Sequence, residues 1–86
     1  MHRASPPPIT GDPSRISHLT PRERQVLMLV GKAASNREIG QQLGITERTV
    51  KAHLANLMTK IEVTTRIEAA IFAYAHHYDI SPPEFS

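Results

Sequence analysis

The stretch GITERTVKAHLANLMTKI, residues 44–61, decides the fold because it opens with a turn signal and continues as one long amphipathic helix. Gly44 can end one helix, and Thr46 can cap the next. The apolar residues that follow recur at spacings of four, three, one and three, which places them on one side of an α-helix. They are Val50, Leu54, Leu57, Met58 and Ile61. We predict that this stripe belongs to the core.

A shorter helix precedes this one. In SNRE, either Ser35 or Asn36 can serve as the N-cap, and Ile39 and Leu43 face inward over about two turns. Only Gly44 and Ile45 separate this helix from the cap of the next. Two helices joined by so short a turn containing Gly are typical of the helix-turn-helix motif.

Two further helices flank the motif. The first begins at LTPRE, where Thr20 and Glu23 can form a capping box and Pro21 suits the first helical position, and it runs to about Lys32. Its inward face is Val26, Leu27, Leu29 and Val30, with Met28 outward. The last begins at TTRIE, with Thr65 and Glu68 as a second capping box, and continues to about Tyr78. The predicted fold is all-α, a four-helix bundle containing a helix-turn-helix.

Composition limits the chain to one small module. It has 86 residues, 40% of them hydrophobic, no Cys, a net charge of +2 and a pI near 9.4. The chain is only mildly basic, so composition alone does not favour a nucleic-acid partner over any other. No apolar run approaches the roughly 20 residues of a membrane span, and residues 1–17 lack the apolar core of a signal peptide. We expect a cytoplasmic protein that has no membrane partner.

Neither an enzyme nor a metal centre is expected. Without Cys there is no thiolate ligand or Cys nucleophile, and no Ser, His and acid are brought together by the predicted helices. The neighbouring His76 and His77 would point about 100° apart on a helix, and no further ligands accompany them. We therefore predict no catalytic residue, no metal and no cofactor.

The ends of the chain differ in composition from its middle. Residues 1–18 hold four of the seven prolines and show no hydrophobic period, so we predict a Pro-rich linker or disordered leader. Residues 19–80 form the folded domain. Residues 81–86, which include Pro82 and Pro83, are predicted to be a disordered tail.

The polar face of the third helix is unusual because acids are nearly absent from it and small residues occupy its outermost ridge. At about 100° per residue, Ala52 lies nearly opposite the core stripe, with Ala55 beside it and Lys51 and His53 on the two flanks. A helix in a DNA major groove needs its backbone close to the bases and methyl groups that can touch thymine. This face is therefore predicted to read double-stranded DNA.

An alternative interpretation remains open at this point. Helix pairs with a short Gly joint also occur in helical protein-protein interaction modules that bind no DNA. Steep salt dependence of duplex binding would separate the two, because neutralising phosphates releases counterions. His53 is likewise ambiguous between a DNA contact and a partly buried histidine satisfied by a neighbour.

Three motifs, LTPRERQVL, SNREIGQQLGITERTVKAH and TTRIEAA, follow one another over residues 19–77 in the order and spacing of a known family. The chain resembles the LuxR-type (NarL/FixJ, GerE-like) helix-turn-helix domain. This resemblance implies a sequence-specific output domain of a bacterial transcriptional regulator of the two-component response type. It also implies an upstream regulatory domain, either a phosphorylated receiver or a small-ligand sensor, that is absent from this chain.

The resemblance implies a role for individual residues in a recognition helix at about 47–61. Base contacts correspond to Lys51, Ala52, His53 and Ala55, and phosphate contacts to Asn36, Arg37, Thr46, Thr49 and Lys60. Relatives often carry Val and a basic residue where Ala52 and Ala55 stand, so this chain should make fewer side-chain contacts there. Relatives usually carry Gly where Ala33 stands, and they commonly carry Gly where Glu62 ends the third helix. If Ala33 is left-handed, it costs about 1 kcal/mol relative to Gly.

The fourth helix has two apolar strips. Ile67, Ala70, Ile71, Tyr74 and Tyr78 form one, which is predicted to pack on the domain. Ala69, Phe72, Ala73 and His76 form the other, which is predicted to be exposed. A surface helix with two apolar faces needs two partners, and the same helix forms the dimer contact in the resembled family. We therefore predict a homodimer on DNA through this second strip, with half-sites about one helical turn apart.

Overall fold

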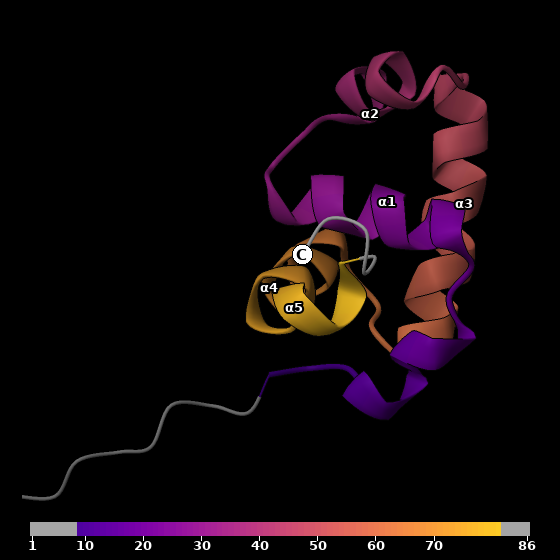
Figure 1. The fold of residues 1–86 in the computed structure, drawn as a ribbon. Coiled ribbons are helices and arrows are strands. Elements are labelled where there is room, and N and C mark those ends of the chain that lie inside the picture. The colour runs from indigo at the N-terminus through magenta and orange to yellow at the C-terminus, as the bar shows by residue number, and fades with distance from the viewer. Residues whose placement is uncertain (1–8, 82–86) are drawn as a thin grey trace, which may run out of the picture.

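The computed structural model describes residues 9–81 and folds them into helices, with no strand among them. The elements are η1 (a 3-10 helix, Pro13–His18), α1 (Pro21–Gly31), α2 (Asn36–Leu43), α3 (Glu47–Ile61), α4 (Arg66–Ala75) and α5 (His77–Ile80). The predicted all-α class is confirmed, and α2 and α3 form the helix-turn-helix (Figure 1). Within residues 9–81 no helix has the length and hydrophobicity to cross a membrane.

The four main helices begin where their capping residues predict. Capping boxes close the starts of α1, α2 and α4, through Thr20 and Glu23, Ser35 and Glu38, and Thr65 and Glu68. At the start of α3 the Thr46 hydroxyl accepts a hydrogen bond from the Thr49 amide, with 3.1 Å between the heavy atoms. These bonds satisfy amides that would otherwise have no partner in the first turn of each helix.

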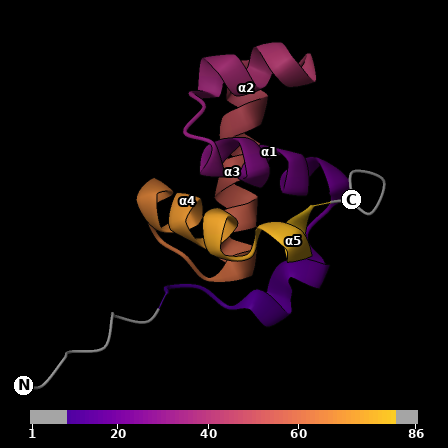
Figure 2. The same cartoon turned by 60° about the vertical axis from the view of Figure 1, so that its left-hand side comes forward.

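Helix α3 is the longest element and links the others. It runs past α2, α1 and α4 in both views of the ribbon (Figures 1 and 2). Helix α1 lies in the middle and packs against both α3 and α4, while α2 packs against the first half of α3. The predicted core stripe of α3 is confirmed, since Val50, Leu54, Leu57 and Ile61 are all buried and Met58 packs at the edge.

The sequence predicts a Pro-rich linker or disordered leader for residues 1–18, and the structure contradicts this for residues 11–18, which pack on the domain. Residues 1–8 lie outside the described part of the chain, but η1 packs against α3 and buries Ile16. The Asp12 amide donates to the Ile61 carbonyl at 2.8 Å. A Cβ on Gly11, whose φ is 103°, would lie 2.6 Å from the Phe72 ring. For residues 11–18 the prediction was wrong because a single apolar residue such as Ile16 gains burial only from a neighbour that is distant in sequence.

The burial of the two apolar strips of α4 is also the reverse of the prediction. Ala69, Phe72 and Ala73 are buried, and Phe72 is wholly so. His76 is half-buried, with its ring 4.6 Å from that of Phe72. The predicted dimer interface is therefore core. The strip assigned to the core is instead largely exposed: Ile67 by 73%, Ile71 by 50%, Tyr74 by 83% and Tyr78 by 92%.

Helix α4 ends three residues earlier than predicted. The backbone leaves helical geometry at His76, with φ −113° and ψ 29°, and the short α5 follows at a different angle. This break turns Ile80 into the core, where it is fully buried. Residues 82–86 of the predicted tail lie outside the described part of the chain.

Two non-glycine residues adopt left-handed backbone conformations. Ala33, with φ 63°, lies in the turn between α1 and α2, and Glu62, with φ 64°, ends α3. Each costs about 1–2 kcal/mol, because the Cβ approaches the following carbonyl oxygen.

A partly buried ion pair joins α1 to the end of α3. The Glu23 carboxylate is almost fully buried and accepts hydrogen bonds from the Lys60 ammonium at 2.7 Å and from the Thr20 amide at 2.9 Å. Burial by itself would raise the pKa of the Glu23 carboxyl, but these hydrogen bonds outweigh it and hold the pKa below the ordinary value of 4.5.

We predict that Ala33→Gly raises the free energy of unfolding by about 0.5–1 kcal/mol. Relief of about 1–2 kcal/mol of backbone strain exceeds the roughly 0.4–1 kcal/mol by which Gly stabilises the unfolded chain. Urea unfolding measures the difference. The matched control is Ala34→Gly, at a position with negative φ, which should lower stability instead. Destabilisation by both substitutions would contradict the assigned strain.

A second prediction concerns acid unfolding. Because the pKa of Glu23 is lower in the folded state, the unfolded chain takes up this proton first as the pH falls. The stability that Glu23 contributes is thus present above about pH 4.5 and is lost as the pH falls through the folded-state pKa. Glu23→Gln should therefore lose stability less steeply than the parent between about pH 6 and pH 2.

Urea unfolding at a series of pH values tests this expectation. Glu38 and Glu68 also have lowered pKa values, that of Glu68 reaching about 2. Hydrogen bonds from Ser35 stabilise the Glu38 carboxylate, whereas hydrogen bonds from Thr64, the residue before the cap, and then from Thr65 stabilise the Glu68 carboxylate. The parent and Glu23→Gln both retain Glu38 and Glu68, so the difference between their curves of stability against pH reports on Glu23 alone. Parallel curves would show that Glu23 contributes no pH dependence.

Candidate nucleic-acid interface

The turn between α2 and α3 is held by a close backbone approach. Gly44 takes the left-handed conformation with φ 69°, and the Ile45 amide donates to the Gly40 carbonyl at 3.0 Å. A Cβ on Gly40 would lie 2.7 Å from the Ile45 carbonyl oxygen, so this position in α2 has no room for a side chain. The turn thereby sets the angle at which α3 leaves α2.

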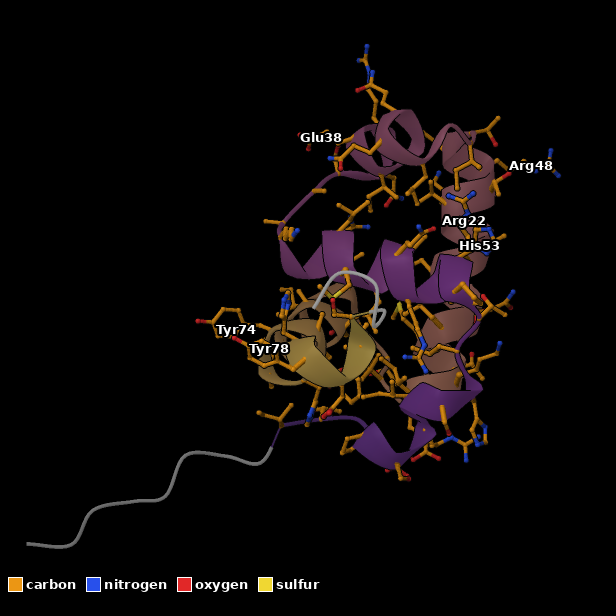
Figure 3. The ribbon with its side chains drawn as sticks, viewed as in Figure 1. Arg22, Glu38, Arg48, His53, Tyr74 and Tyr78 are labelled. Atoms are coloured by element: carbon orange, nitrogen blue, oxygen red, sulfur yellow. The ribbon has the colours of Figure 1, made fainter. Side chains whose placement is uncertain are left out.

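The outer side of α3 carries the predicted base-contacting residues. Lys51, Ala52 and Ala55 are exposed, whereas His53 is half-buried. Figure 3 shows Arg48 pointing outward from the first half of α3, away from the rest of the domain. No acidic residue occurs from Arg48 to Lys60, so the face combines basic and small side chains. The structure brings these residues onto one accessible surface, and their roles remain predictions.

Most of the predicted phosphate contacts gather around the turn. Arg37 and Thr46 are exposed and line one shallow hollow of about 410 Å³. The other residues that line this hollow are Gly40, Gln41, Gly44, Ile45 and Glu47. Thr49 lies one turn into α3, and its hydroxyl is 3.0 Å from that of Thr46. Backbone amides at the start of α3 add a partial positive charge at the same place.

Asn36, at the start of α2, is held by an arginine from α4. Its side-chain oxygen accepts a hydrogen bond from one Arg66 Nη atom at 2.6 Å, and the other Nη atom donates to the Ala34 carbonyl at 2.7 Å. Arg66 thus ties the start of α4 to the segment that leads into α2. The sequence offered no signal for this contact, because 30 residues separate the two side chains.

Lys60 does not join the other predicted phosphate contacts. It lies in the last turn of α3, about 16 Å along the helix axis from Thr49 at 1.5 Å per residue. Its ammonium group already donates to the Glu23 carboxylate. The ammonium has three donors, so two remain for other acceptors.

A separate apolar surface lies on the opposite side of the domain. Tyr74 and Tyr78 project to the left in Figure 3, while Arg48 projects to the right. With Ile67 and Ile71 these tyrosines form what we call the α4 surface. Sequence periodicity found both apolar strips of α4, but it carries no information on which strip meets α1.

The described residues contain no group of three or more His, Cys, Asp or Glu side chains that could hold a metal ion. His76 packs on Phe72, and His77 lies 5.3 Å from the Tyr78 ring in an edge-on arrangement. Both histidines therefore have aromatic neighbours.

Comparison with known proteins gives consistent matches. The family model described as "Bacterial regulatory proteins, luxR family" matches residues 17–73. Over 59 residues the chain is 42% identical to the transcriptional regulatory protein LiaR of Bacillus subtilis. It is 44% identical over 59 residues to the response regulator protein VraR of Staphylococcus aureus and to that of Staphylococcus epidermidis. Each match covers 69% of this chain and 28% of the relative, so the chain spans less than a third of these relatives.

Proposed function

Because the chain belongs to the luxR family of bacterial regulatory proteins, we propose that it binds specific double-stranded DNA with α3 in the major groove. The observation that carries this proposal is the accessible face of α3 from Arg48 to Lys60, which is basic, free of acids and has alanines on its outermost ridge. A helix with this face brings its backbone close to base edges while its cations neutralise phosphates.

Lys51 is the principal base contact in this proposal. It is exposed on the flank of the ridge, and a lysine there reaches guanine O6 and N7 in the groove. Ala52 and Ala55 contact thymine methyl groups, and His53 offers the exposed part of its ring to a neighbouring base.

The residues around the helix-turn-helix turn hold the DNA backbone. Arg37 and Thr46 meet one phosphate beside the shared hollow, with Thr49 and the amides of α3 close by. Asn36 contributes through its amide nitrogen, because its oxygen is engaged by Arg66. Lys60 reaches a more distant phosphate with the donors that Glu23 leaves unused.

The printed names of the relatives describe a transcriptional regulatory protein and a response regulator. By analogy, we propose that this chain is the DNA-binding output part of a cytoplasmic response regulator whose regulatory domain lies upstream. The rival function is a helical protein-protein interaction module that uses the same face. Duplex binding that weakens steeply with salt supports the DNA reader, whereas salt-insensitive binding to a protein supports the rival.

The α4 surface is the contact that we propose for a homodimer on DNA. Its two isoleucines and two tyrosines recur on one side of α4 and α5 and are at least half exposed. Burying this side against a second copy removes apolar area from water and relates the two α3 helices by a two-fold axis. Two half-sites about one helical turn of DNA apart match such a dimer.

We predict that Lys51→Ala weakens binding to the preferred duplex by about 1–3 kcal/mol and relaxes the preference at one base pair. Selection from a random duplex library, followed by titration at two salt concentrations, measures both effects. Lys32→Ala is the matched control, since Lys32 is exposed at the end of α1 away from α3. Equal weakening on every sequence would make Lys51 a phosphate contact.

For the dimer, Tyr74→Asp should reduce cooperative binding to paired half-sites by about tenfold or more, because it places a charge in the apolar contact. Binding to a single half-site and the helical circular dichroism signal should not change. Ser17→Asp, which adds the same charge on exposed η1, is the control. Undiminished cooperativity in Tyr74→Asp would remove the α4 surface from the dimer. Phe72→Asp is unsuitable for this purpose, because it would bury a carboxylate in the core.

A further inference from the structure

The outermost ridge of α3 contains only a few side chains. At about 100° per residue, Arg48, Ala52, Ala55 and Thr59 fall within a sector of roughly 60°, opposite the buried stripe. Asn56 lies about 40° beyond Ala52 on one shoulder of this ridge. All five residues are exposed, so each faces whatever α3 binds.

Most of these side chains are too short to reach a base edge with a polar group or have no free hydrogen-bond donor. The alanines end at a methyl group. The Thr59 hydroxyl donates to the Ala55 carbonyl at 3.1 Å, so it is engaged within its own helix. Only Arg48 and Asn56 extend a polar group from the ridge or its shoulder, and Lys51 does so from the opposite flank.

Neither polar side chain is held by the domain. Among the hydrogen bonds and ion pairs of the described residues, none involves the side chain of Arg48 or Asn56. This contrasts with Lys60 and Arg66, whose charged groups are committed to contacts inside the protein. Figure 3 shows Arg48 extending outward from the first half of α3.

The chemistry of these groups selects different bases. A guanidinium donates two hydrogen bonds to guanine O6 and N7, and a carboxamide pairs with adenine N6 and N7. The alanine methyls between them suit a thymine methyl group. Eight residues at 1.5 Å per residue separate Arg48 from Asn56 by about 12 Å, or three to four base pairs at about 3.4 Å each.

We propose that Arg48 and Asn56 determine base preference at two positions that Lys51 does not read. Arg48 selects guanine and Asn56 selects adenine, three to four base pairs apart at about 3.4 Å per pair, with thymine preferred beside the alanines. This inference rests on the proposed function, since it requires α3 to lie in the major groove. It gives the half-site a polarity, because the guanine end lies toward the start of α3.

The experiment is selection of duplexes from a random library by four variants and the parent, each as the whole 86-residue chain. The test variants are Arg48→Ala and Asn56→Ala. The matched controls are Arg37→Ala, an exposed arginine of α2 assigned to a phosphate, and Gln42→Ala, an exposed amide of α2 away from the ridge. Circular dichroism verifies that every variant is folded.

Support for the proposal is a specific change in base preference. Each test variant should lose preference at one position by roughly fivefold to a hundredfold, and the two positions should be three or four base pairs apart. Arg37→Ala should weaken binding to all sequences alike, and Gln42→Ala should change nothing. Uniform weakening by Arg48→Ala or Asn56→Ala would overturn the proposal while leaving DNA binding intact. Failure of the parent to enrich any sequence would overturn both the proposal and the function on which it rests.

Discussion

Burial of one stripe along α3 is the constraint on which the rest of the structure depends. Val50, Leu54, Leu57 and Ile61 must leave water together, so α1, α2 and η1 pack along that side of the helix, and α4 packs in turn on α1. Each of these side chains stabilises the fold by about 1.5–3 kcal/mol when buried. The opposite side of α3 is left exposed by the same geometry. The surface available for DNA is therefore a direct consequence of how the core is built.

Polar contacts fix both ends of this helix. At its start, the approach of Gly40 to the Ile45 carbonyl and the Thr46 cap set the turn from α2. At its end, the Lys60 ammonium binds the Glu23 carboxylate. The Asp12 amide donates to the Ile61 carbonyl, and the Arg15 side chain donates to the Lys60 carbonyl at 2.6 Å. Carbonyls that a helix end leaves unpaired are thus satisfied by the segment that precedes α1. A helix held at both ends presents its outer face with little freedom, as the proposed recognition of base edges requires.

The differences between the predicted and the observed structure have a shared cause. Local patterns place apolar residues on the correct strips, yet both strips of α4 are apolar and their burial depends on the position of α1. Phe72 is buried because α4 packs on α1 and Gly11 lies against the Phe72 ring, and both partners are far away in sequence. Ile16 follows the same rule, since a lone isoleucine among prolines has no local period. The commitment of Lys60 to Glu23 was hidden for the same reason, as 37 residues separate them.

The sequence by itself determined the starts of the four main helices, the helix-turn-helix and the exposed ridge of α3. Capping boxes, glycine turns and helical periods are interactions between residues within about four positions of one another, so they can be read along the chain. Only the tertiary structure decided which face of α4 is buried, that the segment before α1 belongs to the fold, and which polar groups on α3 remain free. Those outcomes depend on contacts between distant segments, which no local pattern records.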